Sequence, residues 1–180
     1  MQIDNMAVLR ELPLILLLLA LLGLRARVSP RVNLWIKAAP HAVFRLLDFR
    51  EGDEQRWQRT RVSCALLDAA TRTYRLRFTT PLATGACLGS EADFRVETHD
   101  EPHRLVIKRA GLEGRSENNQ LLEMHATFTP EMGGTRLRMT YVWGSRPLLA
   151  QLLARTDLWG SAYRLKGLAE TGKSDYRTDS

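Results

Sequence analysis

The residues that could carry metal or acid–base chemistry are few in this sequence and lie far apart. His99 and His103 bracket Asp100 and Glu101, and that spacing could in principle hold a metal ion. Pro102 and the hydrophilic surroundings are more typical of a hairpin tip, so we predict no metal site. The sequence contains no phosphate-binding loop, dinucleotide glycine motif, nucleophile elbow or HExxH motif.

Tyr141 is the best remaining candidate for catalysis, because a buried tyrosine can orient a carbonyl group or act as an acid. Alternation places it on the apolar face of the predicted strands, and we expect no Asp, Glu, His or Lys on that face. His125 alternates with Met124 and Ala126, which puts it on the outer face. A tyrosine buried in a sheet is usually structural, so we predict no catalytic residue and no cofactor.

Length and charge restrict the class of protein. The 180 residues are 44% hydrophobic, which allows one membrane segment and one domain with a substantial core. The net charge of +6 makes nucleic acid and anionic lipid candidate partners. We expect no nucleic-acid binding, because exposed aromatic residues interleaved with basic ones are lacking. Cys64 and Cys87 are too few for a disulfide framework, and we expect both to be reduced and at least partly buried.

The leucine-rich stretch 12–24 carries no charge. As a helix it covers about 20 Å, short of the roughly 30 Å hydrocarbon core, so a signal-peptide core and a buried helix are alternatives. The residues around the stretch fit a cleaved signal poorly, and Arg25, Arg27 and Arg31 follow it, with Arg10 before it. We therefore predict a single-pass membrane anchor with the globular domain in the cytoplasm.

The spacing of apolar residues changes along the chain from a helical period to a strand period and back. The predicted elements, in order, are a strand at 32–37, a helix from Pro40 to Asp48 or Phe49, a polar passage at 50–58 anchored by Trp57, strands between 60 and 143, and a helix at 147–171. Turn residues separate the strands, which indicates consecutive hairpins. We expect the sheet to wrap the final helix.

The final helix has two apolar stripes on a helical wheel. The first comprises Leu148, Leu149, Leu152, Trp159 and Tyr163, and the side opposite to it comprises Asp157, Ser161 and Arg164. The second comprises Leu158, Ala162, Leu165 and Ala169. We expect the leucines before Gly160 to cover the mouth of a cavity and the second stripe to pack toward the sheet. A bend or a close backbone contact is predicted near Gly160.

This order of elements resembles the START-like, or SRPBCC, superfamily with its helix-grip fold. The marks are the opening segment Ile36-Lys37-Ala38-Ala39-Pro40-His41-Ala42-Val43-Phe44-Arg45-Leu46-Leu47-Asp48, then Trp57, and the closing helix with Leu165-Lys166-Gly167-Leu168. The resemblance implies an α+β fold in which a curved antiparallel seven-stranded sheet surrounds a long C-terminal helix. We predict a membrane anchor with one transmembrane helix at 1–28, the helix-grip domain at 29–171 and a disordered tail at 172–180.

In this superfamily the cavity between sheet and helix often holds a lipid, sterol or polyketide, so the resemblance implies a hydrophobic small molecule or lipid as ligand. Alternation independently predicts large apolar side chains along the cavity. The predicted ligand-binding residues are Trp57, Tyr74, Phe78, Phe94, Leu122, Met124, Phe128, Met139, Tyr141, Trp143, Leu152 and Trp159. A filled core, a polyketide cyclase- or dehydratase-like enzyme and a protein-interaction module are the alternatives.

The predicted outer face of the sheet carries Arg75, Arg77, Arg95 and Lys108. Asp93 and Glu97 can pair with some of these cations across the strands, as in an ordinary solvated face. A basic face that approaches anionic lipid is the alternative.

Overall fold

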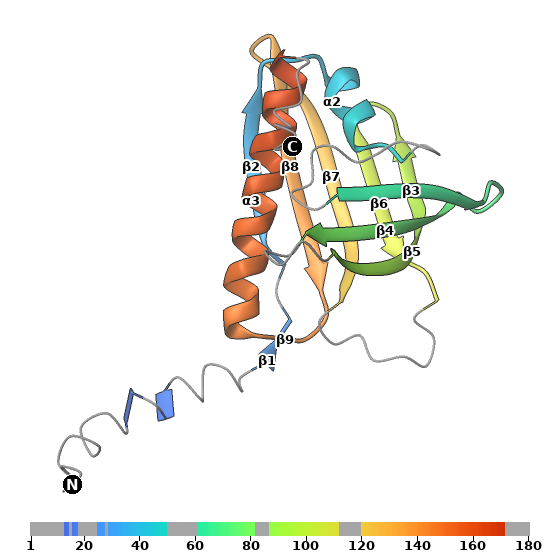
Figure 1. Ribbon diagram of the computed structural model, residues 1–180. Coiled ribbons are helices and arrows are strands. Elements are labelled where there is room, and N and C mark those ends of the chain that lie inside the picture. The colour runs from blue at the N-terminus through green and yellow to red at the C-terminus, as the bar shows by residue number, and fades with distance from the viewer. Residues whose placement is uncertain are drawn as a thin grey trace, which may run out of the picture.

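The computed structural model describes residues 13–14, 16–17, 25–27, 29–49, 61–81, 87–111 and 120–171 (Figure 1). Seven antiparallel strands form one sheet in the order β2-β8-β7-β6-β5-β4-β3. Their bounds are β2 Arg31–Ile36, β3 Arg61–Asp68, β4 Thr73–Pro81, β5 Cys87–Asp100, β6 Arg104–Arg109, β7 Leu121–Glu131 and β8 Gly134–Trp143. The helices are α2 Pro40–Leu47 and α3 Leu148–Thr171. The predicted seven-stranded antiparallel sheet and the long C-terminal helix are therefore confirmed.

Alternation along the strands produces one continuous apolar face, which we call the inner face. Tyr74 lies opposite Phe94, and Met124 opposite Tyr141, so buried residues of neighbouring strands stand side by side. These side chains share one hydrophobic cluster with buried residues of α2 and α3. The core therefore lies between the inner face and the two helices.

Two irregularities in strand pairing change which residues face inward. The register shifts between Leu121 and Glu123, so Leu121 lies opposite Trp143 and packs against the core, while Leu122 sits at the irregularity. The predicted inward position of Leu122 is corrected accordingly. A second shift, between Val96 and Thr98, is followed by His99 opposite the buried Leu105.

His99 is therefore not part of a solvated hairpin tip. Its ring packs edge-on against Phe44 of α2, with ring centroids 5.0 Å apart. Its Nε2 lies 3.1 Å from the carboxylate of Asp48, the residue that follows α2. The expectation that the apolar side of the sheet lacks histidine is wrong, because the irregularity in β5 shifts the alternation. His99 therefore connects β5 to the end of α2 through its contacts with Phe44 and Asp48.

Helix α3 buries the second predicted stripe. Leu158, Ala162 and Leu165 are fully buried, as expected. Two residues of the first stripe are largely exposed, Leu152 at 63% and Tyr163 at 57%, whereas Trp159 is half-buried and packs against the core. Ser161, predicted to face away from the core, is only 3% exposed. The predicted place of Leu152 at the mouth of the cavity stays a prediction.

The helix runs without interruption through Gly160, which is half-buried. Figure 1 shows α3 as one helix alongside β2, with which it is in contact. The predicted bend or close backbone contact near Gly160 stays a prediction.

A two-stranded pairing lies outside the main sheet. β1, Arg25–Ala26, pairs antiparallel with β9, Arg146–Pro147, and β9 leads directly into α3. The pairing therefore fixes the chain that leaves the leucine-rich stretch next to the start of α3.

No helix among the described residues is long and apolar enough to cross a membrane. Most of the predicted anchor at 12–24 lies outside the described residues, as do Trp57 with the passage around it and the tail at 172–180. The described leucines of the stretch, Leu14, Leu16 and Leu17, are exposed.

Candidate functional site

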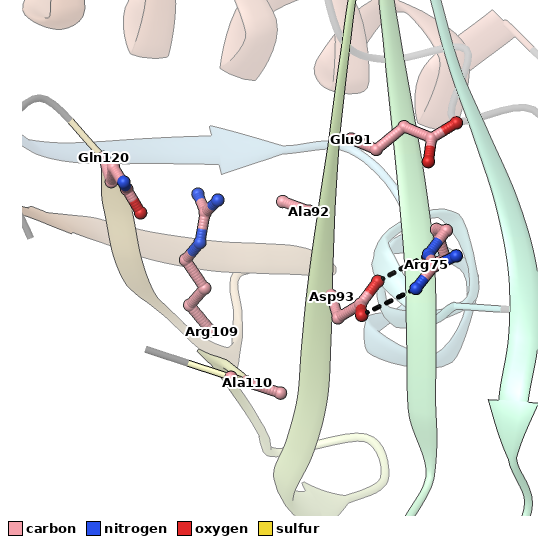
Figure 2. A pocket seen from close by; sticks show the side chains of 8 residues that line it. Arg75, Glu91, Ala92, Asp93, Arg109, Ala110 and Gln120 are labelled. Carbon is pink, nitrogen blue, oxygen red and sulfur yellow. Dashed lines mark hydrogen bonds and ion pairs between the residues drawn. The ribbon is translucent and has the colours of Figure 1, made fainter. Parts of the chain in front are cut away.

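At the end of β6, strand β5 loses its pairing partner on that side, which leaves an opening in the main sheet. Arg109, the last residue of β6, pairs with Phe94, but β5 extends back to Cys87 and in that stretch pairs with β4. A hollow of about 400 Å³ lies at this opening (Figure 2). It is lined by Arg75, Glu91, Ala92, Asp93, Arg109, Ala110, Gly111 and Gln120.

Arg109 lines the hollow and also belongs to the inner face of the sheet. It follows the inward residues Leu105 and Ile107 at period two, and it lies directly across from the buried Phe94. The Cζ atom of Arg109 is 5.9 Å from the centre of the Phe94 ring, within range of a cation–π interaction. Figure 2 shows its side chain extending between Gln120 and Ala92. A charged group therefore stands where the apolar face meets the hollow.

The two acids of the hollow are each bound by an arginine of β4. Arg75 donates two hydrogen bonds to the carboxylate of Asp93, at 2.8 and 3.0 Å, and Arg77 donates to Glu91 at 2.7 Å. The hydrogen bonds from Arg75 lower the pKa of Asp93, and the charge of Arg109 acts in the same direction. Both carboxylates are therefore neutralised from the outer side of the sheet.

A second group of polar side chains lies at the end of β8. Tyr141 and Trp143 both face inward, one strand period apart. The Nε1 atom of Trp143 is buried, and in the described part of the chain it has no hydrogen-bond partner. Burial raises the pKa of the Tyr141 hydroxyl, and the negative charge of Asp157 on α3 adds to this rise. The hydroxyl therefore stays protonated and can donate a hydrogen bond.

Arg146 covers the ring of Trp143. Its Cζ atom lies 3.9 Å from the ring centre, a close cation–π contact. Burial lowers the pKa of the Arg146 guanidinium, while Asp157 opposes the shift. The amide of Gln151 donates to the carbonyl oxygen of Arg146 at 3.1 Å, which holds β9 against the first turns of α3.

Strand register shows that the two groups occupy the same end of the sheet. Lys108 lies opposite Glu123, Glu123 lies opposite Val142, and their neighbours Arg109 and Trp143 end β6 and β8. Only β7 separates these two strands. Four polar groups therefore lie at this end of the inner face: the guanidinium groups of Arg109 and Arg146, the indole N–H of Trp143 and the hydroxyl of Tyr141.

Most of the predicted lining residues lie on the inner face. The buried ones are Tyr74, Phe94, Met124, Phe128, Met139 and Tyr141, and the partly buried ones that pack against the core are Phe78, Trp143 and Trp159. Leu122 is half-buried at the irregularity, Leu152 is exposed, and Trp57 lies outside the described residues. None of the predicted residues that the structure describes lines the hollow. Their role in ligand binding stays a prediction.

Sequence reasoning missed Arg109 and Arg146. The signal for Arg109 was present, because it continues the alternation of Leu105 and Ile107, but an arginine at the end of a strand resembles an outward one. Arg146 lies in a two-residue strand that has no periodic pattern. Its position over Trp143 depends on the pairing of β9 with β1.

The outer face carries ion pairs, as predicted from cross-strand spacing. Besides the arginines of β4, Lys108 lies 2.7 Å and Arg95 3.4 Å from Glu97. These residues are substantially exposed, so each pair contributes little to stability. The predicted burial of Cys64 is also confirmed.

No protein-family model matches the chain, and no curated protein matches it. Solved structures do. A protein from Arthrobacter aurescens is 14% identical, with a TM-score of 0.60 over 84% of this chain and 92% of that one. The Aha1 dimer from Colwellia psychrerythraea is 17% identical, with a TM-score of 0.55 over 81% of this chain and 98% of that one.

The di-domain ARO/CYC BexL, from the BE-7585A biosynthetic pathway, is 20% identical, with a TM-score of 0.54 over 84% of this chain and 51% of that one. Identities at this level show the fold alone. The architecture and these similarities together show that the chain has the helix-grip fold.

Proposed function

We propose that the domain binds a hydrophobic small molecule or lipid between the inner face and α3. One observation carries this proposal: the buried indole N–H of Trp143 has no hydrogen-bond partner in the described part of the chain. Leaving such a donor unsatisfied costs about 1–3 kcal/mol. A ligand that places a carbonyl or ester oxygen there recovers this cost.

The surroundings of Trp143 favour a ligand that is mostly apolar. Its inward neighbours on β7 and β8 are Leu121, Met124 and Tyr141, and Tyr141 supplies a second donor. A few polar groups within an apolar lining are typical of a small-molecule site, because they orient a ligand that burial of apolar surface holds. The bound molecule therefore needs an acceptor near one end.

Analysis of the full chain purified from its host tests the proposal. Native mass spectrometry and organic extraction should find a hydrophobic molecule bound to the wild type. Trp143→Phe should lower its occupancy about tenfold, because one hydrogen bond to the ligand is lost. Trp35→Phe is the matched control, since the Nε1 of Trp35 donates to the carbonyl oxygen of Glu131, at 3.0 Å, and lies away from Trp143.

Protein that stays empty after extraction, and that no lipid stabilises against heat, contradicts the proposal. It favours instead a filled core and a protein-interaction module. Equal occupancy in both tryptophan variants contradicts the assigned position of the ligand.

We also propose that residues 12–24 tether the domain to a membrane, with the domain in the cytoplasm. Two features support this: the uncharged leucine run and the pairing of β1 with β9, which holds the following chain against the domain. Alkaline extraction of membranes should leave the full chain in the pellet, and a chain that starts at Ser29 should be released. Release of the full chain, or labelling of Ser63→Cys from outside the cell, contradicts the tether or its orientation.

A cyclase- or dehydratase-like enzyme is the second candidate. Its specific support is Tyr141, whose hydroxyl stays protonated because burial raises its pKa, so it can donate to a substrate carbonyl. Tyr141→Phe should then abolish turnover of a polyketide-like substrate without unfolding the domain. Binding without any turnover in the wild type favours the binding function.

A further inference from the structure

We propose that the first turns of α3 dock onto the membrane, with Leu152 and Leu153 in the interface between the lipid head groups and the acyl chains. This inference rests on the proposed membrane tether and adds the surface that the domain turns toward the bilayer. Its basis is the pairing of β1 with β9, which joins the chain that leaves the leucine-rich stretch to the start of a helix with exposed leucines.

The pairing of β1 with β9 leaves no linker between the leucine-rich stretch and the domain. The stretch ends at Leu24, and the next residue, Arg25, pairs with Pro147. Because neighbouring Cα atoms are about 3.8 Å apart and paired ones about 5 Å, at most about 10 Å separates the stretch from Pro147. Helix α3 begins at the residue after Pro147, and Figure 1 shows β1 and β9 at that end of the helix. A stretch that enters the hydrocarbon core therefore brings the start of α3 to the membrane surface.

Two leucines at the start of α3 are exposed. Leu152 and Leu153 are each 63% exposed. They lie about 6–8 Å along the helix axis from its first residue, at 1.5 Å per residue. The head-group region on each side of the hydrocarbon core is about 5–8 Å thick. Both leucines are therefore within reach of the interface, where apolar side chains are removed from water.

The charges around the two leucines favour a surface of anionic lipids. Arg25 and Arg27 are exposed on the segment that follows the stretch, and Arg155 is exposed on α3. Asp157 is the acid in the same turns of the helix. Attraction between arginines and anionic head groups adds to the burial of apolar area when a helix lies at the interface.

The small size of this apolar surface favours lipid over a protein partner. A stable interface between proteins covers roughly 800 Å² on each partner, far more than two leucine side chains provide. A lipid surface requires no such area here, because the proposed tether already holds the domain at the membrane.

Full-chain protein in nanodiscs of phosphatidylcholine and phosphatidylserine tests the inference. An environment-sensitive fluorophore is attached to a single cysteine, after Cys64→Ala and Cys87→Ala. Thr156→Cys places the label at an exposed position one turn after the leucines. Met132→Cys places the control label at the exposed β7–β8 turn, at the opposite end of β8 from β9. Nitroxide-labelled lipids should quench the label at position 156 and leave the label at position 132 unquenched.

Replacement of both leucines, Leu152→Gln with Leu153→Gln, should lower the ratio of docked to undocked protein at least about tenfold. Quenching at position 156 should then fall to the level at position 132. Leu67→Gln is the matched control, because Leu67 is a 47% exposed leucine on β3, and it should keep the quenching. Both variants should stay in the pellet after alkaline extraction, since the tether is unchanged. In nanodiscs of phosphatidylcholine alone, quenching should be weaker, because attraction of the arginines to the lipid is lost.

A label at position 156 that the lipids leave unquenched, in protein that stays in the pellet, overturns the inference and leaves the proposed tether standing. Shielding of this label from aqueous iodide without quenching by the lipids indicates that protein, such as a second copy, covers the leucines, and it also overturns the inference. Equal quenching with and without the two leucines overturns their role, and equal quenching on the two lipid compositions overturns that of the arginines. Release of the wild type on alkaline extraction overturns the tether together with the inference.

Discussion

The guanidinium of Arg146 lies over the indole of Trp143, with 3.9 Å between Cζ and the ring centre. The contact joins β9 to the end of β8, just before α3 begins. It therefore holds the start of α3 against the sheet at the open end of the domain.

A double-mutant cycle with Arg146→Gln and Trp143→Leu should give a coupling free energy of about 1–2 kcal/mol, because the contact is partly desolvated. Denaturant unfolding of the two single variants and the double variant measures it. Additive effects of the two substitutions contradict a stabilising contact.

Thr135→Val should lower the free energy of unfolding by about 1–3 kcal/mol. The buried hydroxyl of Thr135 donates to the carbonyl oxygen of Ala38 at 2.6 Å, and valine leaves this acceptor without its donor. Thr129→Val on the exposed side of β7 is the control and should change stability by less than about 0.5 kcal/mol. Similar losses in both variants contradict a specific role for the hydrogen bond.

Two glycine-to-alanine substitutions should have opposite signs. A Cβ atom on Gly134 would overlap the carbonyl oxygen of Ile36 and lie 3.0 Å from the Trp35 ring, so we expect a loss of about 2 kcal/mol or more. A Cβ atom on Gly167 in α3 meets nothing within 4 Å, so alanine there should add about 0.5–1 kcal/mol. Thermal melts of the two variants compare them directly, and a stabilised Gly134→Ala contradicts the close approach of β2 and β8.

Truncation of two leucines tests which side of α3 faces the sheet. Leu158→Ala should cost about 2–5 kcal/mol, because Leu158 is fully buried and leaves a cavity. Leu152→Ala should change stability by less than about 0.5 kcal/mol, since its side chain is largely exposed. Urea unfolding measures both, and a larger loss at Leu152 than at Leu158 would contradict the observed orientation of α3.

The ion pair of Arg75 with Asp93 should make stability depend on pH in the acid range. Its hydrogen bonds lower the pKa of Asp93 below the ordinary value of 3.8 in the folded state. A lowered carboxyl pKa contributes stability above the unfolded pKa and loses it as the pH falls through the folded one. The difference in unfolding free energy between wild type and Asp93→Asn should therefore be largest above about pH 4 and shrink below it.

Arg75→Gln provides the converse measurement. In the Arg75→Gln background, Asp93→Asn should change the acid dependence of the unfolding free energy much less than it does in the wild-type background. An unchanged difference would show that Arg75 is not the cause.

Periodicity determined the parts of this molecule that local spacing controls. The alternation around Phe94 and Tyr141 identified the strands and their inward residues, because a strand turns successive side chains to opposite faces. The fold class followed from a resemblance to a known superfamily, which the segment 36–48 and the closing helix carry. Leu158, Ala162 and Leu165 were assigned to the sheet side by periodicity.

Cross-strand pairing and the packing of distant elements decided the rest. Leu122 and His99 departed from their predicted faces because register shifts in β7 and β5 arise between strands, not within one. The burial of Ser161, which a helical wheel placed on the polar side of α3, also depends on the elements that pack around the helix. The position of Arg109 at the hollow depends on the end of β6, because β5 extends beyond its pairing with that strand. The position of Arg146 depends on the pairing of β9 with β1. Neither feature follows from the spacing of residues within one strand.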